Sequence, residues 1–322
     1  MQYRAYGLVL ASDAPLPELT PIAGAESAAQ ADVRIRFLGP RQEFFSPSHW
    51  FMSWTLPTGD LWLSCAKDER GYLLRFPELA DFFIDFSGRE IVCYAGRETP
   101  PLTTSHLLLN QVLPLVLNLR GSDALHATAI LTPHGVCAFA GPTGAGKSTL
   151  AASFLRNGYP ALSDDCLVLE NSGGQILATP AFPGLRLWPD AVEALRDHGD
   201  ALHPVAQYTS KQRLVSKCQS AEFPTAAHPL ARIYSLARPD DEETEDRLAD
   251  PHIECLSRRD SFIELLQCTF RLDITDRAML LRQFHFLEQV ISHVPFRRLS
   301  VPNAFSSLPA VCEAVLADLD RP

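Results

Sequence analysis

The sequence contains Gly141-Pro142-Thr143-Gly144-Ala145-Gly146-Lys147-Ser148-Thr149, a glycine-rich segment from which the expected architecture follows. Its G-x-x-x-x-G-K-S spacing is that of a phosphate-binding loop, or P-loop. In such a loop the glycines turn backbone N–H groups toward phosphate oxygens. The lysine reaches the β- and γ-phosphates, and the serine hydroxyl binds Mg²⁺. We therefore expect Gly141–Thr149 to bind the phosphates of a nucleoside triphosphate.

The segments around the loop predict an α/β fold. Apolar runs at Leu125–Leu131 and Gly135–Ala140 precede it and favour strands. Lys147–Asn157 is typical of a helix that stops at Gly158. Pro160–Ser163 predicts the next strand, and Asp164-Asp165 stands at its end. This order, strand, loop, helix and strand, is the one that a P-loop domain needs.

Further elements are expected on both sides of this core. Thr104–Arg120 predicts a helix with Gly121 as its C-cap, and Pro114 predicts a kink or a break in it. Ser257-Arg258-Arg259-Asp260 resembles a capping box at a helix start. The later elements are a helix from Pro189, a strand near Ile233–Leu236, helices at Arg258–Phe270 and Thr275–Ser292, a strand near Phe296–Val301 and a helix from about Ser306. Ala23–Asp32 and the acidic stretch Arg238–His252 favour loops.

The first hundred residues predict a β-rich domain. Short apolar runs alternate with turn-forming clusters, which is typical of an antiparallel meander. The runs are Tyr6–Leu10, Val33–Phe37, Trp50–Leu56, Leu61–Cys65, Tyr72–Phe76, Phe82–Phe86 and Ile91–Tyr94. Pro100-Pro101 ends the pattern, because proline cannot donate to a sheet. We expect two domains, residues 1–100 and 101–322.

The composition of the chain limits which partners and which kinds of cysteine site are expected. The net charge of −10 and the scattered basic residues disfavour a nucleic-acid partner. The longest apolar stretch, Leu107–Leu119, is broken by polar residues and by Pro114, so no membrane partner is expected. The eight cysteines form no C-x-x-C pair and indicate single buried thiols rather than a zinc site or disulfides. We expect a cytoplasmic protein.

Three polar residues near the loop are candidates for chemistry. A strand end beside a P-loop is where a carboxylate can hold Mg²⁺ or accept the proton of an attacking hydroxyl. Adjacent side chains in an extended segment point to opposite sides, so Asp164 and Asp165 are expected to have different tasks. His126 lies among apolar residues, and taken alone it is more typical of a core histidine.

These segments together resemble HPr kinase/phosphorylase. The resemblance rests on Leu125-His126-Ala127, Gly141–Thr149, Asn157-Gly158-Tyr159 and Ser163-Asp164-Asp165, within residues 104–190. It implies a P-loop kinase fold shared with ATP-dependent PEP carboxykinase. It also implies that Asp164 is the base for a serine hydroxyl, that Asp165 and Ser148 hold Mg²⁺, that Lys147 binds phosphates, and that His126 is a supporting polar group.

Two regions refine the resemblance. Phe182–Pro189 stands where the family has a glycine- and arginine-rich signature tied to its phosphorylase activity, and it does not match. Tyr6-Gly7-Leu8 and Leu16-Pro17-Glu18-Leu19 resemble HPr-kinase-like proteins encoded with ribosomal peptide clusters. Those similar proteins include lasso-peptide kinases, which phosphorylate the C-terminal serine of a precursor peptide.

Three further cations are candidates for substrate or phosphate contacts: Arg186, Lys211 and Arg213. Cations at these positions could neutralise charge in phosphoryl transfer, although an exposed lysine or arginine is usually a solvated surface group. Trp188, beside the helix start at Pro189, is expected to be a packing residue.

The sequence as a whole predicts an ATP- and Mg²⁺-dependent kinase that phosphorylates a serine of a peptide or small protein. A kinase of small-molecule hydroxyls and a non-catalytic ATP-sensing regulator remain alternatives. Assembly into a homo-oligomer also stays open.

Overall fold

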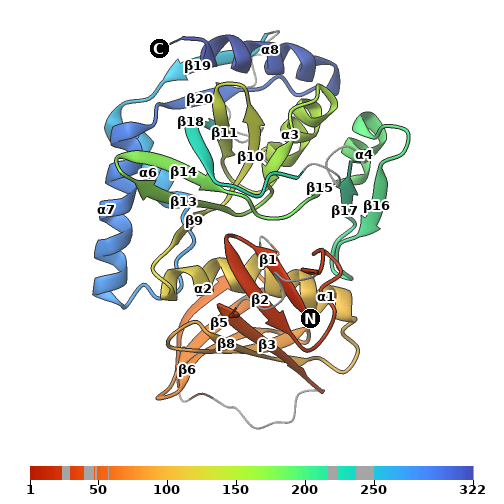
Figure 1. Ribbon diagram of the computed structural model, residues 1–322, viewed down its shortest axis with the longest axis vertical. Helices are drawn as coiled ribbons and strands as arrows, with labels where there is room; N and C mark the ends of the chain where they lie inside the picture. The colour runs from red at the N-terminus through yellow and green to blue at the C-terminus, as the bar shows by residue number, and fades with distance from the viewer. Residues whose placement is uncertain are drawn as a thin grey trace. The chain divides into compact units, whose positions relative to one another are not determined.

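The computed structural model describes residues 1–23, 30–39, 47, 49–56, 58–216, 223–236 and 250–321 (Figure 1). The chain forms two units. The N-terminal unit contains Met1–Ser122, Val205–Thr209 and Arg271–Thr275, and the P-loop unit contains Asp123–Pro204, Ser210–Phe270 and Asp276–Pro322. Most of the two expected loops, Ala23–Asp32 and Arg238–His252, and also Cys218, fall outside the described residues.

An eight-stranded sheet forms the N-terminal unit, in the order β1-β2-β3-β8-β7-β6-β5-β4. Its strands are β1 Gln2–Ala5, β2 Leu8–Ser12, β3 Val33–Leu38, β4 Trp50–Thr55, β5 Leu61–Lys67, β6 Gly71–Phe76, β7 Ala80–Asp85 and β8 Glu90–Ala95. From β4 to β8 the strands form the expected antiparallel meander, whereas β3 pairs in parallel with both β2 and β8.

The expected first strand, Tyr6–Leu10, starts two residues too early, because β2 is Leu8–Ser12. Tyr6 and Gly7 form the turn between β1 and β2, with φ of 55° and 76°. A two-residue hairpin turn of type I′ needs positive φ at both central positions, which glycine adopts readily and tyrosine does not. Because Tyr6 has an aromatic ring, the sequence pattern counted it as a strand residue rather than as a turn residue.

One long helical segment follows the sheet: α1 (Pro101–Leu107), a π-helical turn η2 (Leu108–Val112) and α2 (Leu113–Leu119). In the π-helical turn, the Leu113 N–H donates to the carbonyl of Leu108. The same register would pair the Leu109 carbonyl with residue 114, which is proline and has no N–H. The Tyr6 hydroxyl donates to that carbonyl instead, at 3.0 Å. Pro114 therefore changes the helical register and leaves a carbonyl that another part of the chain satisfies.

Two later segments belong to the N-terminal unit. The Gln207 N–H donates to the Thr103 hydroxyl at 3.1 Å. Asp273 is fully buried, and its carboxylate accepts from Lys67 Nζ at 3.1 Å and from the Tyr72 hydroxyl at 3.0 Å. After the sheet ends, Pro101 begins α1, whose residues Thr103–Leu107 are buried.

The P-loop unit is built on a nine-stranded sheet of mixed direction. Seven strands follow the order β12-β10-β11-β18-β14-β13-β9, and β20 pairs with both β18 and β19. The strands are β9 Asp123–Leu125, β10 Ala127–Thr132, β11 Gly135–Ala140, β12 Ala161–Ser163, β13 Leu167–Ser172, β14 Gln175–Thr179, β18 His228–Leu236, β19 His252–Cys255 and β20 Phe296–Ser300.

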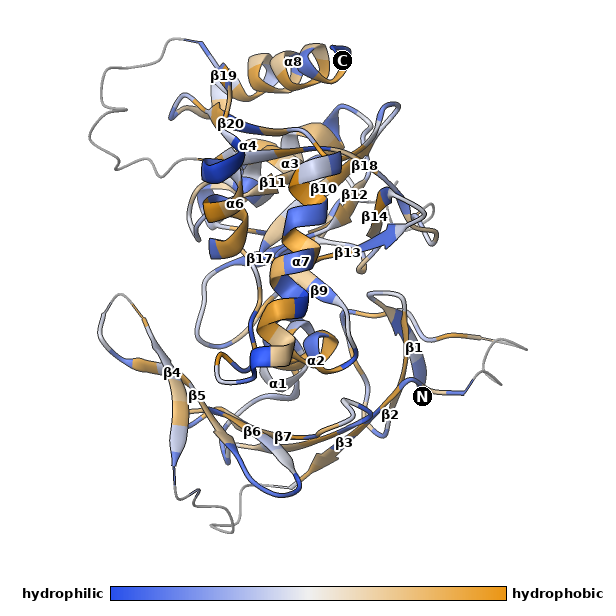
Figure 2. Ribbon diagram, turned by 90° about the vertical axis from the view of Figure 1, so that its left-hand side faces the viewer, coloured by the Kyte–Doolittle hydropathy of each residue, from blue (hydrophilic) through white to orange (hydrophobic). Residues whose placement is uncertain are grey.

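Four helices pack on this sheet: α3 Lys147–Arg156 and α8 Leu308–Leu319 in one core cluster, and α6 Arg258–Gln267 and α7 Arg277–His293 in the other. Helix α4, Pro189–Leu195, contacts α3 and strands β15 and β17. Alternation along β11 divides the core: Phe139 packs with side chains of α3 and α8, and Ala138 packs with side chains of α6 and α7. Figure 2 shows hydrophobic and hydrophilic residues mixed along α7. Its buried residues, Met279, Gln283, Leu287 and Val290, recur at helical spacing.

Helix α6 begins as expected, because the Ser257 hydroxyl accepts from the Asp260 N–H and caps the helix. It ends earlier than expected. Residues 268–270 leave the helix and run beside β9, where Leu125 bridges Thr269 and the Phe270 N–H donates to the Ala124 carbonyl at 3.0 Å. This bridge is a tertiary contact that the helical pattern of the sequence does not contain.

Strands β1 and β19 and two further groups of strands were not predicted from the sequence. Strands β13 and β14 form a hairpin around Gly173-Gly174, a turn signal that was present. A separate three-stranded sheet, β15-β17-β16, contains β15 Leu185–Leu187, β16 Ala201–Pro204 and β17 Gln212–Val215. These strands are short and carry charged residues, so no apolar run indicates them.

None of the seven described cysteines forms a disulfide, and five of them are buried as expected, whereas Cys255 is exposed and Cys268 is partly exposed. Within the described ranges, no helix combines the length and the hydropathy needed to cross a bilayer.

The Tyr6–Leu109 contact gives a stability prediction. Tyr6→Phe removes the donor from a buried carbonyl, and we expect the free energy of unfolding to fall by about 1–3 kcal/mol. In a Pro114→Ala background, the alanine supplies an N–H for the same carbonyl, so Tyr6→Phe should cost less. Urea unfolding of the four proteins of this double-mutant cycle measures the difference, and equal costs in both backgrounds would refute the explanation.

Candidate active site

The P-loop connects β11 to α3. Gly141 has φ of 142°, and a Cβ there would lie 2.8 Å from the carbonyl oxygen of Leu236. Gly144 and Gly146 have φ of 90° and 87°, and a Cβ on either would meet no atom within 4 Å. Within the described residues, the N–H groups of Gly144, Gly146, Lys147 and Ser148 donate to no protein group. The loop thus passes close to β18 on one side and presents unpaired donors on the other, which suits an anion.

Lys147 turns back toward the loop. Its Nζ donates to the carbonyls of Gly141 at 2.8 Å and Pro142 at 2.9 Å, and it lies 3.1 Å from Nε2 of His126. The side chain is buried, and burial lowers the pKa of its ammonium group, while Asp165 and Asp164 oppose that shift. The Lys147 ammonium therefore lies among three acceptors, two of which are carbonyls of the P-loop itself.

His126 occupies the break between β9 and β10 rather than the middle of one strand. Its N–H donates to the Cys268 carbonyl at 2.6 Å, and its Nδ1 lies 3.0 Å from the Asp165 carbonyl. Because Lys147 can only donate, Nε2 must accept and Nδ1 must carry the proton. Burial and the charge of Lys147 lower the pKa of His126, which agrees with a neutral ring. His126 thus links Lys147 to the backbone of Asp165.

Asp164 is buried and accepts hydrogen bonds at both carboxylate oxygens. Oδ1 accepts from the hydroxyls of Thr128 and Ser148, each at 2.8 Å. Oδ2 accepts from the Arg186 N–H at 2.8 Å, and Arg186 Nη1 lies 3.3 Å away. Asp164 is only 2% exposed, so little of its surface is accessible to solvent or to a substrate.

Asp165 has a different environment. Its φ of 63° lies in the left-handed region, and the residue is partly exposed. Burial opposes its ionisation, but the positive charges of Arg186, Lys211 and Lys147 outweigh that effect and hold its pKa below the usual range. The two aspartates therefore differ in environment, and the more accessible one is Asp165.

The donor set fits Mg²⁺ bound together with a triphosphate. Ser148 and Asp164 contribute two oxygens that already lie 2.8 Å apart. Among the described residues, no group of three or more His, Cys, Asp or Glu side chains could hold a metal ion alone. Mg²⁺ is usually held by one or two protein oxygens with phosphate oxygens and water, so this sparse set suits it.

The three candidate cations lie on or beside the small sheet and differ in exposure. Arg186 on β15 is 2% exposed and contacts Asp164, and Arg213 on β17 is 9% exposed and donates to the Pro183 carbonyl at 3.2 Å. Lys211 is partly exposed, with Nζ 5.2 Å from the centre of the Trp188 ring. Trp188, the residue that precedes Pro189 at the start of α4, is 45% exposed, and its ring contacts Lys211.

Sequence reasoning missed three residues of this site. Thr128 donates to Asp164, the Cys268 carbonyl binds the His126 N–H, and the Phe270 ring lies edge-on to His126 with centroids 6.1 Å apart. Thr128 stands two positions after His126, a spacing that could have indicated a shared face. Cys268 and Phe270 arrive through tertiary contacts and left no local signal.

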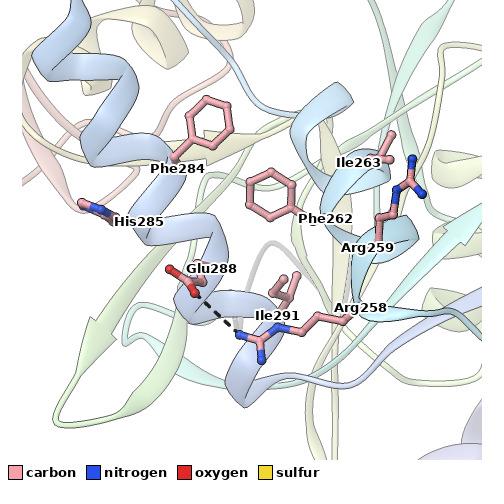
Figure 3. Close-up of a pocket in the computed structure, with 8 residues that line it drawn as sticks. All are labelled: Arg258, Arg259, Phe262, Ile263, Phe284, His285, Glu288 and Ile291. Atoms are coloured by element: carbon pink, nitrogen blue, oxygen red, sulfur yellow. Dashed lines mark ion pairs between the residues drawn. The ribbon is translucent and has the colours of Figure 1, made fainter.

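A pocket of about 620 Å³ lies between α6 and α7 (Figure 3). In Figure 3 the rings of Phe262 and Phe284 lie near one another between the helices, with centroids 5.6 Å apart. Arg258 and Glu288 form an ion pair at 3.8 Å beside them. None of the predicted site residues lines this pocket.

The neutral state of His126 gives a pH prediction. Its pKa in the folded chain lies below the value of about 6.5 expected in the unfolded chain. The unfolded chain therefore binds this proton more tightly, and the free energy of unfolding should fall as the pH drops below about 6.5. Part of that decrease should vanish in His126→Gln. NMR titration should assign to His126 a signal that titrates below pH 6.5, and a signal titrating above that pH would contradict the assignment.

The buried pair Asp164–Arg186 gives a stability prediction. Arg186→Met leaves the buried carboxylate of Asp164 with fewer hydrogen-bond donors, so we expect the free energy of unfolding to fall by about 3–5 kcal/mol. The matched control is Arg156→Met, since Arg156 lies 3.7 Å from Asp197 and both side chains are largely exposed. The control should change stability by less than about 1 kcal/mol. Equal effects in chemical unfolding would mean that the buried pair contributes no more than a surface pair.

Comparison with known proteins adds a distant structural similarity. No protein-family model matches the chain, and no curated protein matches its sequence. A search of solved structures finds, among others, the structure of the Hpr(Ser) kinase/phosphatase from Coxiella burnetii, with a TM-score of 0.32 and 11% sequence identity. The match covers 61% of this chain and 97% of that chain. At this TM-score the similarity assigns neither a family nor an activity.

Proposed function

We propose that this protein is a kinase that transfers the γ-phosphoryl group of ATP to a hydroxyl, most specifically to a serine of a peptide or small protein. The observation that carries the proposal is the hydrogen bond between the P-loop hydroxyl of Ser148 and the buried carboxylate of Asp164, at 2.8 Å. It joins a phosphate-binding loop to an aspartate pair, the combination that phosphoryl transfer requires.

Phosphate binding is assigned to Gly141–Thr149. The unpaired N–H groups of the loop would receive phosphate oxygens, and the positive end of α3 would favour their charge. Lys147 lies at the mouth of the loop, where its ammonium would exchange the Gly141 and Pro142 carbonyls for phosphate oxygens. The Lys147 ammonium also donates a hydrogen bond to Nε2 of His126, and this contact would orient the ammonium.

The geometry supports roles for the two aspartates that are the reverse of those implied by the resemblance. Asp164 already contacts Ser148, so these two residues would hold Mg²⁺, which would neutralise charge on the phosphate oxygens. Asp165 is partly exposed and anionic, so it would receive the acceptor hydroxyl. A carboxylate with so low a pKa is a weak base. In a loose transition state, orienting the nucleophile matters more than basicity.

Transfer of the γ-phosphoryl group to serine would be an in-line displacement. The serine oxygen forms a bond to the γ-phosphorus while the bond from that phosphorus to the bridging oxygen breaks, and ADP leaves with the electron pair. The hydroxyl proton passes to the carboxylate of Asp165. Lys147 and the loop N–H groups stabilise the charge that develops on the transferred group.

The choice of a peptide acceptor rests on the sequence resemblance. Tyr6-Gly7-Leu8 and Leu16–Leu19 are similar to the corresponding segments of lasso-peptide kinases. A ribosomally made precursor peptide with a serine is therefore the first acceptor to test. A kinase of small alcohols would use the same residues and differ only in the acceptor.

The test is intact-mass analysis of serine-containing peptides incubated with the protein and Mg-ATP. We expect a gain of one phosphoryl group with the wild type and none with Lys147→Ala. Asp165→Asn should lower the rate by about 10²–10⁴-fold, the usual contribution of a positioned acid–base residue. Asp164→Asn should instead raise the Mg²⁺ concentration needed for half-maximal rate.

Exposed Arg156→Met serves as the control and should leave the rate unchanged. Tight Mg-ATP binding without transfer to any peptide or small alcohol would refute the kinase proposal and favour an ATP-sensing regulator. A rate lost in Asp164→Asn at every Mg²⁺ concentration but retained in Asp165→Asn would restore the roles implied by the resemblance.

A further inference from the structure

Thr128 lies beside Asp164 because of the register between β10 and β12. These strands are antiparallel and Ala129 pairs with Ser163, so the residue before Ala129 and the residue after Ser163 come next to one another. Thr128 is fully buried, and its hydroxyl donates to Oδ1 of Asp164 at 2.8 Å. The proposed transfer of the phosphoryl group gives this hydroxyl no task of its own.

The hydrogen bonds of Asp164 engage both of its oxygens in full. A carboxylate has about four lone-pair positions, about two on each oxygen. At Oδ1 the donors are the hydroxyls of Thr128 and Ser148, and at Oδ2 they are the N–H and Nη1 of Arg186, at 2.8 and 3.3 Å. Thr128 and Arg186 are buried, whereas Ser148 is partly exposed on the P-loop. Only the lone pair that faces Ser148 can therefore be offered to a cation.

Thr128 and Arg186 restrain the carboxylate from two different strands. A carboxylate that is held at one oxygen can still turn about that contact. Arg186 of β15 holds Oδ2, and Thr128 of β10 holds Oδ1, so that rotation is blocked. Threonine suits this task, because its branched Cβ restricts χ1 and its hydroxyl keeps one direction in the buried strand. Asp164 is thereby limited to one direction of one oxygen.

We infer that Thr128 is a positioning residue that makes Asp164 a one-oxygen ligand and so makes the site select Mg²⁺ over Ca²⁺. This inference rests on the proposed function, in which Ser148 and Asp164 hold the Mg²⁺ that accompanies ATP. Mg²⁺ demands near-octahedral geometry from few protein oxygens, whereas Ca²⁺ takes about six to eight oxygens and often both oxygens of one carboxylate. A carboxylate with Oδ2 engaged and Oδ1 fixed meets the first requirement and not the second.

The test measures nucleotide binding without turnover. A fluorescent, non-hydrolysable ATP analogue is titrated with the full chain in Mg²⁺, in Ca²⁺ or in EDTA. We expect the wild type to bind the analogue more tightly in Mg²⁺ than in Ca²⁺. Thr128→Val removes the hydroxyl and keeps the branched shape. It should weaken binding in Mg²⁺ about tenfold, the usual effect of losing a group that orients a metal ligand. Binding in Ca²⁺ should weaken less, and binding in EDTA should not change.

Two further variants separate positioning from a general loss of structure. Thr128→Ser keeps the hydroxyl and should retain most of the preference for Mg²⁺. Thr132→Val is the matched control, because Thr132 is also buried on β10 and its hydroxyl donates to the Gly135 carbonyl at 2.8 Å, at the other end of the strand. This control should leave the ratio of the affinities in Mg²⁺ and Ca²⁺ unchanged.

Three results would overturn the inference. An equal loss of binding in Mg²⁺, Ca²⁺ and EDTA on Thr128→Val would mean that Thr128 serves only the fold. An unchanged preference for Mg²⁺ in that variant would mean that Thr128 does not select the cation. Equal binding to the wild type in all three conditions would mean that Asp164 holds no cation.

Mass analysis of phosphoryl transfer separates this inference from the kinase proposal. Transfer from Mg-ATP to a peptide, together with an unchanged preference for Mg²⁺ in Thr128→Val, keeps the kinase and removes the role of Thr128. A selective loss of binding in Mg²⁺ on Thr128→Val, without transfer by the wild type to any acceptor, removes the kinase and keeps the selective Mg²⁺ site.

Discussion

The carboxylate of Asp164 is the contact on which the site depends. It accepts hydrogen bonds from Thr128 of β10, Ser148 of α3 and Arg186 of β15, and so it ties three separate elements together at one buried point. A buried carboxylate is costly unless its oxygens are satisfied, and here each oxygen has at least one donor. Helix α3 and the small sheet are thereby both tied to the segment that contains Asp165, which follows β12.

Much of the P-loop unit could be predicted, because its signals are local. The spacing of Gly141, Lys147 and Ser148, the helix stop at Gly158 and the cap at Ser257 depend on a few adjacent residues. What could not be predicted depends on contacts distant in sequence. The His126 N–H donates to the Cys268 carbonyl, and His126 lies in the break between β9 and β10. Asp164 is buried by its hydrogen-bond partners, so Asp165 is the more accessible aspartate. The functional roles themselves remain predictions.

The same distinction applies to the N-terminal unit. Strands β3 to β8 followed from alternation and turns, but the Tyr6-Gly7 turn did not, because its backbone conformation is unusual for tyrosine. Pro114 was expected to disturb a helix, and it does so by inserting a π-helical turn rather than by breaking the chain. The sequence shows that a donor is missing at proline, but only the fold shows that the Tyr6 hydroxyl replaces it.

The inclusion of Val205–Thr209 and Arg271–Thr275 in the N-terminal unit has a consequence for synthesis of the protein. Asp273 supplies the buried carboxylate that Lys67 and Tyr72 contact, so this part of the unit has no partner until residue 273 has left the ribosome. Domains made first usually fold first. Here the segment that is translated first must wait for most of the P-loop unit before its own core is complete, and a gene fragment encoding residues 1–122 alone would not encode a finished unit.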